Sequence, residues 1–219
     1  RIALNGSHDF AISPSDTQLN LTIIKQDLNA SYGPDTLDVT LTGDFNQVIT
    51  TLRIQDDGQQ TSNYQAGPIQ TETLSLTLSS PGIYHLALRA GNDLRYDVIT
   101  NAAALAVQGS VELLDSSQSL NLFFLPKQET VEFQFSASYA GSTPQTVSLY
   151  DSSDQLAAQH TIENFNGRNI LRASVPPEER EKIWRLHIEN QDLDIRSPQV
   201  EYWFPVKDQV LDLEAISSI

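Results

Sequence analysis

Hydrophobic and polar residues alternate with a period of two along most of the chain. Leu74, Leu76 and Leu78, for example, are separated by single polar residues. A β-strand with one buried face has this period, because successive side chains point to opposite faces. The pattern predicts strands at Leu19–Lys25, Leu37–Thr42, Thr50–Gln55, Thr73–Leu78, Ile83–Arg89, Leu94–Ile99, Val111–Leu114, Leu120–Leu125, Thr130–Ser138, Thr146–Tyr150, Leu156–Ile162, Ile170–Val175, Ile183–Ile188 and Val200–Phe204.

One short pattern of strand, proline corner and strand occurs twice. The first copy covers residues 72–88 and the second covers residues 169–188. In each copy an alternating run stops at proline, and the next run has an aromatic residue, Tyr84 or Trp184, in its second position. Short strands with turn signals between them are typical of β-sandwiches. The repetition therefore predicts two sandwiches in tandem.

The predicted fold class is all-β, with two tandem antiparallel β-sandwich domains of the jelly-roll or immunoglobulin-like kind. We expect the domains to cover residues 1–105 and 106–219, because residues 102–109 are small, uncharged and lack alternation. This segment is either a linker or a short edge strand. Helix is expected only as one turn at residues 178–182, after two prolines. Such short loops leave no room for the helices that parallel strands require.

Composition excludes several functional classes. The net charge is −15, of which residues 1–108 contribute −6 and residues 109–219 contribute −9. An acidic surface disfavours nucleic acids and anionic membranes as partners. Cysteine is absent, which excludes disulfides and thiol catalysis. The longest apolar runs, such as residues 122–125, are far too short to span a membrane. Because the chain opens at Arg1 and contains no Met, we expect a mature form or an excised segment of a longer protein.

No catalytic motif is present in the sequence. His85 and His187 lie in alternating strands, where we expect them to face solvent, and His8 and His160 are isolated. Neither the nucleophile motif of α/β-hydrolases nor a glycine-rich nucleotide-binding loop occurs. The carboxylates lie mostly in turns. We therefore predict that the chain is not an enzyme, and an unrecognised hydrolase is the least favoured alternative.

No cofactor is predicted, and a structural calcium ion is the one metal kept as an alternative. Calcium takes six to eight oxygen ligands, often several from one loop. Two turns are rich in such oxygens, namely Asp56-Asp57-Gly58 and Asp151-Ser152-Ser153-Asp154. Neither has the spacing of an EF-hand loop, so ordinary hairpin turns are the favoured interpretation.

Aromatic residues supply the candidate binding site. Trp184 shares one strand face with Leu186 and Ile188, which predicts a core position. In the segment Tyr202-Trp203-Phe204, alternation directs at least one ring away from the local core. Exposed aromatic rings can stack on sugars. We therefore expect the ligand-binding residues Tyr202, Trp203, Arg196 and Gln199. Packing of the outward ring against the first domain is the alternative.

Three segments of the second half follow one another in a recognisable order: residues 122–133, the hairpin of residues 147–156, and residues 175–186, which include Val175-Pro176 and Lys182-Ile183-Trp184. In this order and spacing the second half resembles accessory β-sandwich domains of secreted bacterial hydrolases, with the layout of pre-peptidase C-terminal domains. The first half, through residues 80–84, fits a preceding sandwich of such a tail. The departures are Gln128, where glycine is usual, and Asp154-Gln155, where Asp-Gly is usual.

The resemblance implies a non-catalytic accessory role in a secreted protein, extracellular or periplasmic. The leading hypothesis is carbohydrate-associated binding or adhesion, with a polysaccharide or glycan and other domains of the parent chain as partners. A purely structural spacer or protein-interaction module is the alternative. Neither nucleic-acid binding nor membrane insertion is expected.

Overall fold

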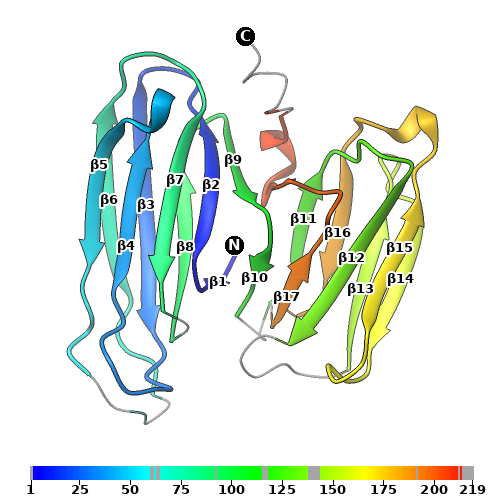
Figure 1. The fold of residues 1–219 in the computed structure, drawn as a ribbon, viewed down its shortest axis with the longest axis horizontal. Helices are drawn as coiled ribbons and strands as arrows, with labels where there is room; N and C mark the ends of the chain where they lie inside the picture. The colour runs from blue at the N-terminus through cyan, green and yellow to red at the C-terminus, as the bar shows by residue number, and fades with distance from the viewer. Residues whose placement is uncertain are drawn as a thin grey trace. The chain divides into compact units, whose positions relative to one another are not determined.

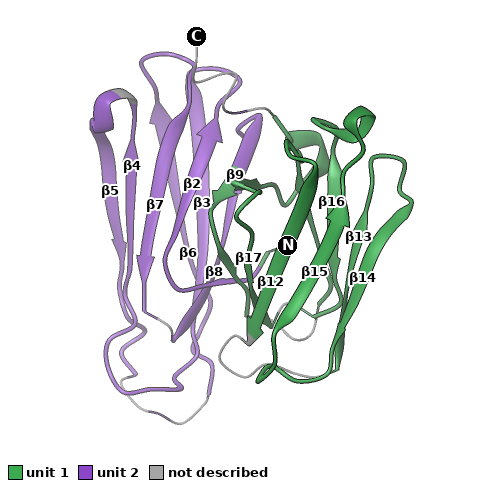
Figure 2. Cartoon of the chain, turned by 45° about the vertical axis from the view of Figure 1, so that its right-hand side comes forward, with its two compact units in different colours: residues 1–2, 106–212 green, residues 3–105, 213–219 purple. Residues whose placement is uncertain are grey.

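The computed structural model describes residues 2–59, 62, 65–91, 93–114, 118–137, 144–190, 192–211 and 213. In these residues the chain forms antiparallel strands joined by loops and three short 3₁₀ helices (Figure 1). It divides into two compact units (Figure 2). The N-terminal unit comprises residues 3–105 and 213–219, and the C-terminal unit comprises residues 1–2 and 106–212. The predicted all-β, antiparallel sandwich class is confirmed.

The N-terminal unit contains two antiparallel sheets with the strand orders β1-β8-β3-β6 and β9-β2-β7-β4-β5. The last three residues of β9 belong to the C-terminal unit. The elements are β1 (Leu4–Asn5), β2 (His8–Ser13), β3 (Gln18–Asp27), β4 (Leu37–Thr42), η1 (Asp44–Asn46), β5 (Val48–Ile54), β6 (Gln70–Thr77), β7 (Tyr84–Ala90), β8 (Leu94–Thr100) and β9 (Ala104–Gln108).

The C-terminal unit also contains two antiparallel sheets, with the orders β10-β17-β12-β15 and β11-β16-β13-β14. The short strand β18 pairs with the last residues of β9. The elements are β10 (Val111–Glu112), β11 (Leu120–Phe124), β12 (Thr130–Ala137), β13 (Gln145–Tyr150), β14 (Leu156–Ile162), β15 (Asn169–Ser174), η2 (Pro177–Glu179), β16 (Trp184–Ile188), β17 (Leu193–Arg196), β18 (Tyr202–Trp203) and η3 (Lys207–Gln209).

The two units repeat one strand topology. The order β8-β3-β6 in the first unit corresponds to β17-β12-β15 in the second, and β2-β7-β4-β5 corresponds to β11-β16-β13-β14. Both copies of the proline corner lie at equivalent places, between β6 and β7 and between β15 and β16. Each corner takes the chain from the last strand of one sheet to an inner strand of the other. The repeated sequence pattern therefore marks a repeated change of sheet.

The period-two pattern determines which side chains are buried. In β3, Leu19, Leu21 and Ile23 are inaccessible to solvent, and the residues between them are at least partly exposed. The same register directs Lys25 and Asp27 inward at the end of the strand, where both are buried. A strand that is apolar along most of its inner face thus ends in a buried pair of opposite charges.

Trp184 lies in the core of the C-terminal unit, as predicted. Its side chain is 1% exposed, and its indole N–H donates to Glu179 Oε2 at 3.2 Å. Glu179 belongs to η2, so the single helical turn expected at 178–182 is a 3₁₀ helix that starts one residue earlier. The acidic turn after the prolines therefore supplies a partner for the one polar atom of a buried ring.

Several strand predictions need correction. The chain also forms strands at His8–Ser13 and Leu193–Arg196, and the segment left open as linker or edge strand forms β9. β2 was missed because Phe10, Ala11 and Ile12 are all buried, which removes the alternation. The strand predicted at Val200–Phe204 is only Tyr202–Trp203. Ser138, the last residue of another predicted strand, lies outside the described residues.

Candidate functional site

The predicted binding residues do not form one exposed cluster around Trp203. The Trp203 side chain is fully buried, and its ring centroid lies 5.6 Å from those of Phe124 and Phe133. Its indole N–H donates to the carbonyl oxygen of Gly109 at 2.8 Å. The expectation that Trp203 offers an exposed ring is therefore wrong, since neither the ring nor its polar atom is available to a ligand.

Tyr202 is the partly exposed aromatic of the segment, because alternation in β18 directs it away from the buried Trp203. Alternation ends there: Phe204 is also buried and exchanges two backbone hydrogen bonds with Phe123, both at 2.8 Å. Arg196 is exposed and Gln199 is half-buried. Arg196 is the last residue of β17 in the sheet β10-β17-β12-β15, and Gln199 lies in the segment after β17. Both residues lie beside a different candidate site.

The outer face of β15, β12 and β17 is polar. Val131, Phe133 and Phe135 of β12 point into the core, so the residues between them point outward. Across the strands, Glu132 lies opposite Arg172, and Gln134 lies opposite Arg196. The register therefore places two arginines, one carboxylate and one amide on adjoining positions of a single sheet face.

A hydrogen-bonded chain orders this face. Arg172 Nε donates to Glu132 Oε2 at 2.5 Å, and Gln134 Nε2 donates to Glu132 Oε1 at 2.9 Å. The Glu132 backbone N–H donates to Gln199 Oε1 at 3.1 Å. β17 ends at Arg196, so the Gln199 amide takes the place of the missing neighbouring strand at Glu132. Gln199 is thereby held beside the Glu132–Arg172 pair.

These residues surround a surface groove of about 470 Å³. Most of the side chains that line it can form hydrogen bonds. The lining residues are Thr130, Val131, Glu132, Arg172, Ala173, Ser174 and Gln199. We call this set the β12–β15 groove.

The two acidic side chains of this face, Glu132 and Asp194, differ in the direction of their pKa shifts. Hydrogen bonds from Gln134 and Arg172 lower the pKa of Glu132, so its carboxylate is ionised at neutral pH. Burial, together with the nearby Glu112, raises the pKa of Asp194 to about 6. Asp194 accepts a hydrogen bond from Ser136 Oγ at 3.3 Å and shares the outer face of β17 with Arg196. The face therefore presents both donors and acceptors at neutral pH.

The histidines stand apart from this groove. His85 is exposed and His187 is half-buried, with Nδ1 2.9 Å from Asn121 Oδ1. His8 is buried, with Nδ1 2.7 Å from the Tyr96 hydroxyl. Among the residues that the structure describes, no group of three or more His, Cys, Asp or Glu is placed to hold a metal ion, and no helix is long and apolar enough to cross a bilayer.

In the oxygen-rich turn at 151–154, the aspartate side chains already form hydrogen bonds and an ion pair with nearby residues. Asp151 Oδ1 accepts the backbone N–H groups of Ser153 and Gln155, both at 2.9 Å. Asp154 has a positive φ of 63° and pairs with Arg185 at 2.5 Å. This turn is a self-capped hairpin loop. The turn at Asp56-Asp57-Gly58 has a different environment, described below.

No protein-family model matches the chain, and no curated protein matches it. Several solved structures are similar to it at low identity, among them the following three. The N-terminal CBM22-1-CBM22-2 tandem domain from Paenibacillus barcinonensis Xyn10C is 11% identical, with 89% of this chain and 82% of that chain covered and a TM-score of 0.28. Dimeric latent PorU from Porphyromonas gingivalis is 13% identical, with 90% and 19% covered and a TM-score of 0.30.

Tripeptidyl peptidase 2 is 10% identical, with 94% of this chain and 25% of that chain covered and a TM-score of 0.28. The chain therefore spans a quarter or less of the length of the two larger proteins. At these TM-scores the similarities carry no inference about this chain. Its fold class rests on its own strand pairing.

Proposed function

We propose that this chain is a non-catalytic accessory pair of β-sandwiches in a larger secreted bacterial protein, extracellular or periplasmic, and that its β12–β15 groove binds carbohydrate. The observation that carries the proposal is the meeting of Glu132, Arg172 and Gln199 around one open groove. Fixed side-chain donors and acceptors of this kind can orient sugar hydroxyls. The accessory role rests on the resemblance of residues 120–190 to tail domains of secreted hydrolases.

The proposal revises the predicted site. Arg196 and Gln199 are kept, because both lie at the polar face, and Tyr202 is kept as the partly exposed aromatic. Trp203 is dropped, because its ring is buried. Glu132 and Arg172 are added. Sequence reasoning missed them because a charged pair in an alternating strand has the same pattern as any solvated strand face.

Arg172→Ala tests the groove, and Arg53→Ala is the matched control. Both arginines form exposed cross-strand pairs with a carboxylate through Nε at 2.5 Å, but Arg53 pairs with Asp38 in the N-terminal unit. A glycan array and polysaccharide affinity gels identify the ligand of the wild-type chain. We expect Arg172→Ala to weaken retention at least tenfold and Arg53→Ala to leave it unchanged.

Two results contradict the proposal. Wild-type protein that binds no glycan or polysaccharide supports the spacer alternative instead. Equal weakening by both arginine variants shows that retention depends on general charge and not on the groove. Tyr202→Ala, measured on the same gels, decides whether the partly exposed aromatic belongs to the site.

A further inference from the structure

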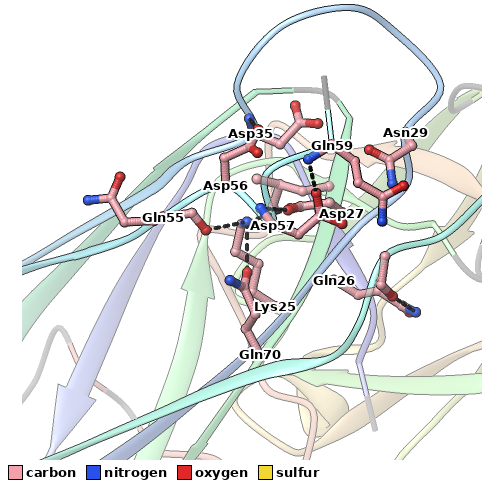
Figure 3. Close-up of polar contacts among 12 residues, drawn as sticks. Lys25, Gln26, Asp27, Asn29, Asp35, Gln55, Asp56, Asp57, Gln59 and Gln70 are labelled. Atoms are coloured by element: carbon pink, nitrogen blue, oxygen red, sulfur yellow. Dashed lines mark hydrogen bonds and ion pairs between the residues drawn. The ribbon is translucent and has the colours of Figure 1, made fainter. Parts of the chain in front are cut away.

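The end of β3 and three loops at one end of the N-terminal unit bring five aspartates together. The loops follow β3, connect β5 to β6 and connect β7 to β8. The aspartates are Asp27, Asp35, Asp56, Asp57 and Asp93. Hydrogen bonds and mutual charge effects link all five, and Figure 3 shows four of them around Lys25. We call this set the aspartate loop cluster.

The cluster is held in place by its own backbone contacts. Asp93 accepts the N–H groups of Ala30 and Ser31 at 2.9 and 2.7 Å. The Asp35 N–H donates to Asp56 Oδ2 at 2.8 Å. The Asp57 N–H donates to Asp27 Oδ2 at 2.9 Å, which ties the second loop to the end of β3. The loops are therefore organised before any ligand arrives.

One buried lysine already neutralises part of the cluster. The Lys25 side chain is inaccessible to solvent and forms an ion pair with Asp27. Its ammonium also donates to Gln55 O and Gln70 Oε1, both at 3.0 Å (Figure 3). Burying an ammonium is costly unless such partners surround it. Lys25 therefore pairs with Asp27 and offsets only part of the negative charge around Asp35.

Four buried side-chain oxygens in and beside the cluster accept no hydrogen bond from the described residues, and one of them, Asp27 Oδ1, is paired with Lys25. The other three are Asn29 Oδ1, Asp35 Oδ2 and Asp57 Oδ2. Asn29 is completely buried, and Asp35 is 6% exposed. The Asn29 amide nitrogen donates to Gln65 O at 2.8 Å, which fixes which end of the amide carries the free oxygen. A buried acceptor without a partner is destabilising. A bound ligand that contacts these oxygens would remove that cost.

Gly67 leaves room for two of these groups. A Cβ at this position would lie 1.9 Å from Asp57 Oδ2 and 3.6 Å from the Asn29 amide nitrogen. The Asp57 carboxylate and the Asn29 amide therefore meet at the same backbone surface. Any residue other than glycine would displace the carboxylate.

The balance of charge points to a cation. Asp35 is buried near the carboxylates of Asp93, Asp27 and Asp56, and the opposing charge comes from Lys25, which is already paired with Asp27. Carboxylates held close together in a poorly solvated place repel one another. A cation coordinated by these side-chain oxygens would give the unpaired acceptors a partner. It would also reduce the repulsion between the carboxylates.

We propose that the aspartate loop cluster binds a calcium ion through the side-chain oxygens of Asn29, Asp35 and Asp57. The set contains oxygen donors alone, it comes from irregular loops, and it includes an amide, all of which suit Ca²⁺. Zinc prefers nitrogen and sulfur ligands, and Mg²⁺ demands a near-octahedral arrangement. Two carboxylates and one amide are fewer protein ligands than calcium uses, so backbone carbonyls and water complete its shell.

This site is independent of the β12–β15 groove. All its residues belong to the N-terminal unit, whereas the groove belongs to the C-terminal unit. Loss of calcium binding and loss of glycan binding are therefore separate outcomes. The variants that test one site leave the residues of the other unchanged.

Isothermal titration of the full chain with CaCl2, after treatment with EGTA, tests the proposal. We expect one ion per chain and a melting temperature several degrees higher in calcium than in EGTA. The double variant Asp35→Asn/Asp57→Asn should lose at least tenfold in affinity and most of the temperature rise. Asp38→Asn removes an exposed acid of the same unit and should behave as wild type.

A second variant separates ligand loss from misfolding. Gly67→Ala keeps every proposed ligand but displaces the Asp57 carboxylate, so it should also weaken calcium binding. Native circular dichroism of each variant in EGTA shows that the unit is folded. Wild-type protein that takes up no calcium, or equal affinity in all four proteins, overturns the proposal. An equal temperature rise in MgCl2 overturns the assignment to calcium.

Discussion

At the scale of single residues, the buried polar side chains carry most of the information about this protein. His8, Lys25 and the Trp203 indole are all buried, and each has a specific partner. Polar atoms that leave water must recover their hydrogen bonds inside the protein. These residues are therefore the positions at which a single substitution has a defined and measurable consequence.

His8 should make the N-terminal unit sensitive to acid. Burial lowers its pKa to about 4, partly offset by Asp9, whereas an unfolded histidine titrates near 6.5. Between these values the unfolded state binds a proton that the folded state does not, so stability falls as the pH decreases from 6.5 to 4. His8→Gln should remove this pH-dependent part of the free energy of unfolding, which is at most about 3 kcal/mol.

Urea unfolding at several pH values between 4 and 6.5 measures the effect. His85→Gln is the control, because His85 lies on the exposed face of a strand. If the His8 variant kept the full acid sensitivity of the wild type, its buried imidazole would not be the source.

Trp184 should be a major contributor to the stability of the C-terminal unit. Its ring is 1% exposed, and removal of a buried Trp side chain typically costs about 3–5 kcal/mol. Trp184→Ala should lower the free energy of unfolding by this amount, and Trp184→Phe should cost less. Chemical denaturation monitored by circular dichroism measures both. A loss below about 1 kcal/mol for alanine, roughly a fivefold change in the unfolding equilibrium, would contradict the burial.

At the scale of elements, alternation predicted most strands, and the exceptions have a common cause. β2 is buried at Phe10, Ala11 and Ile12, so it lacks the polar half of the pattern. β17 is only four residues long. A strand shielded on both faces or limited to a few residues has too little periodicity to be recognised. The proline corners, by contrast, were recognised because their signal is local.

Strand β17 carries a second pH-sensitive group, Asp194. Burial, and after it the charge of Glu112, raises its pKa to about 6. In the unfolded state this carboxyl ionises near pH 4, so the folded state holds more protons between pH 4 and 6, and stability falls as pH rises through this range. Asp194→Asn should therefore raise stability above pH 6, by at most about 2 kcal/mol, because the site is partly solvated.

Melting temperatures at pH 4 and pH 7.5 check this prediction. Glu72→Gln is the control, because Glu72 lies on an exposed strand position. The Asp194 variant should gain stability only at the higher pH. A gain of equal size at both values would show that charge on Asp194 is not the cause.

At the scale of the whole molecule, the chain is one sandwich topology used twice. The two units match strand for strand in sheet order, although their sequences share little beyond the corner. The predicted division at 105/106 implies that each unit folds independently. This stays a prediction.

Residues 106–212 produced alone should fold. This segment contains both sheets of the C-terminal unit and the buried Trp184 and Trp203. We expect cooperative unfolding and a fluorescence maximum at shorter wavelength than that of free tryptophan. Emission at the wavelength of free tryptophan, with no unfolding transition, would show that the units are not independent. Restoring residues 1–2 is not expected to decide the outcome, because only Ile2 is a buried apolar side chain.

The sequence by itself determined the all-β class, the antiparallel strands, the duplicated corner and the burial of Trp184, because each depends on neighbours within a few positions. Only the tertiary structure decided the rest. Trp203 is buried because its unit provides Phe124 and Phe133 beneath it, and Glu132 meets Arg172 because β12 pairs with β15. The loops that carry Asn29, Asp35 and Asp57 lie at one end of the N-terminal unit because the sheet order gathers segments that are distant in the chain. Convergence of this kind follows from strand pairing, which a local pattern does not encode.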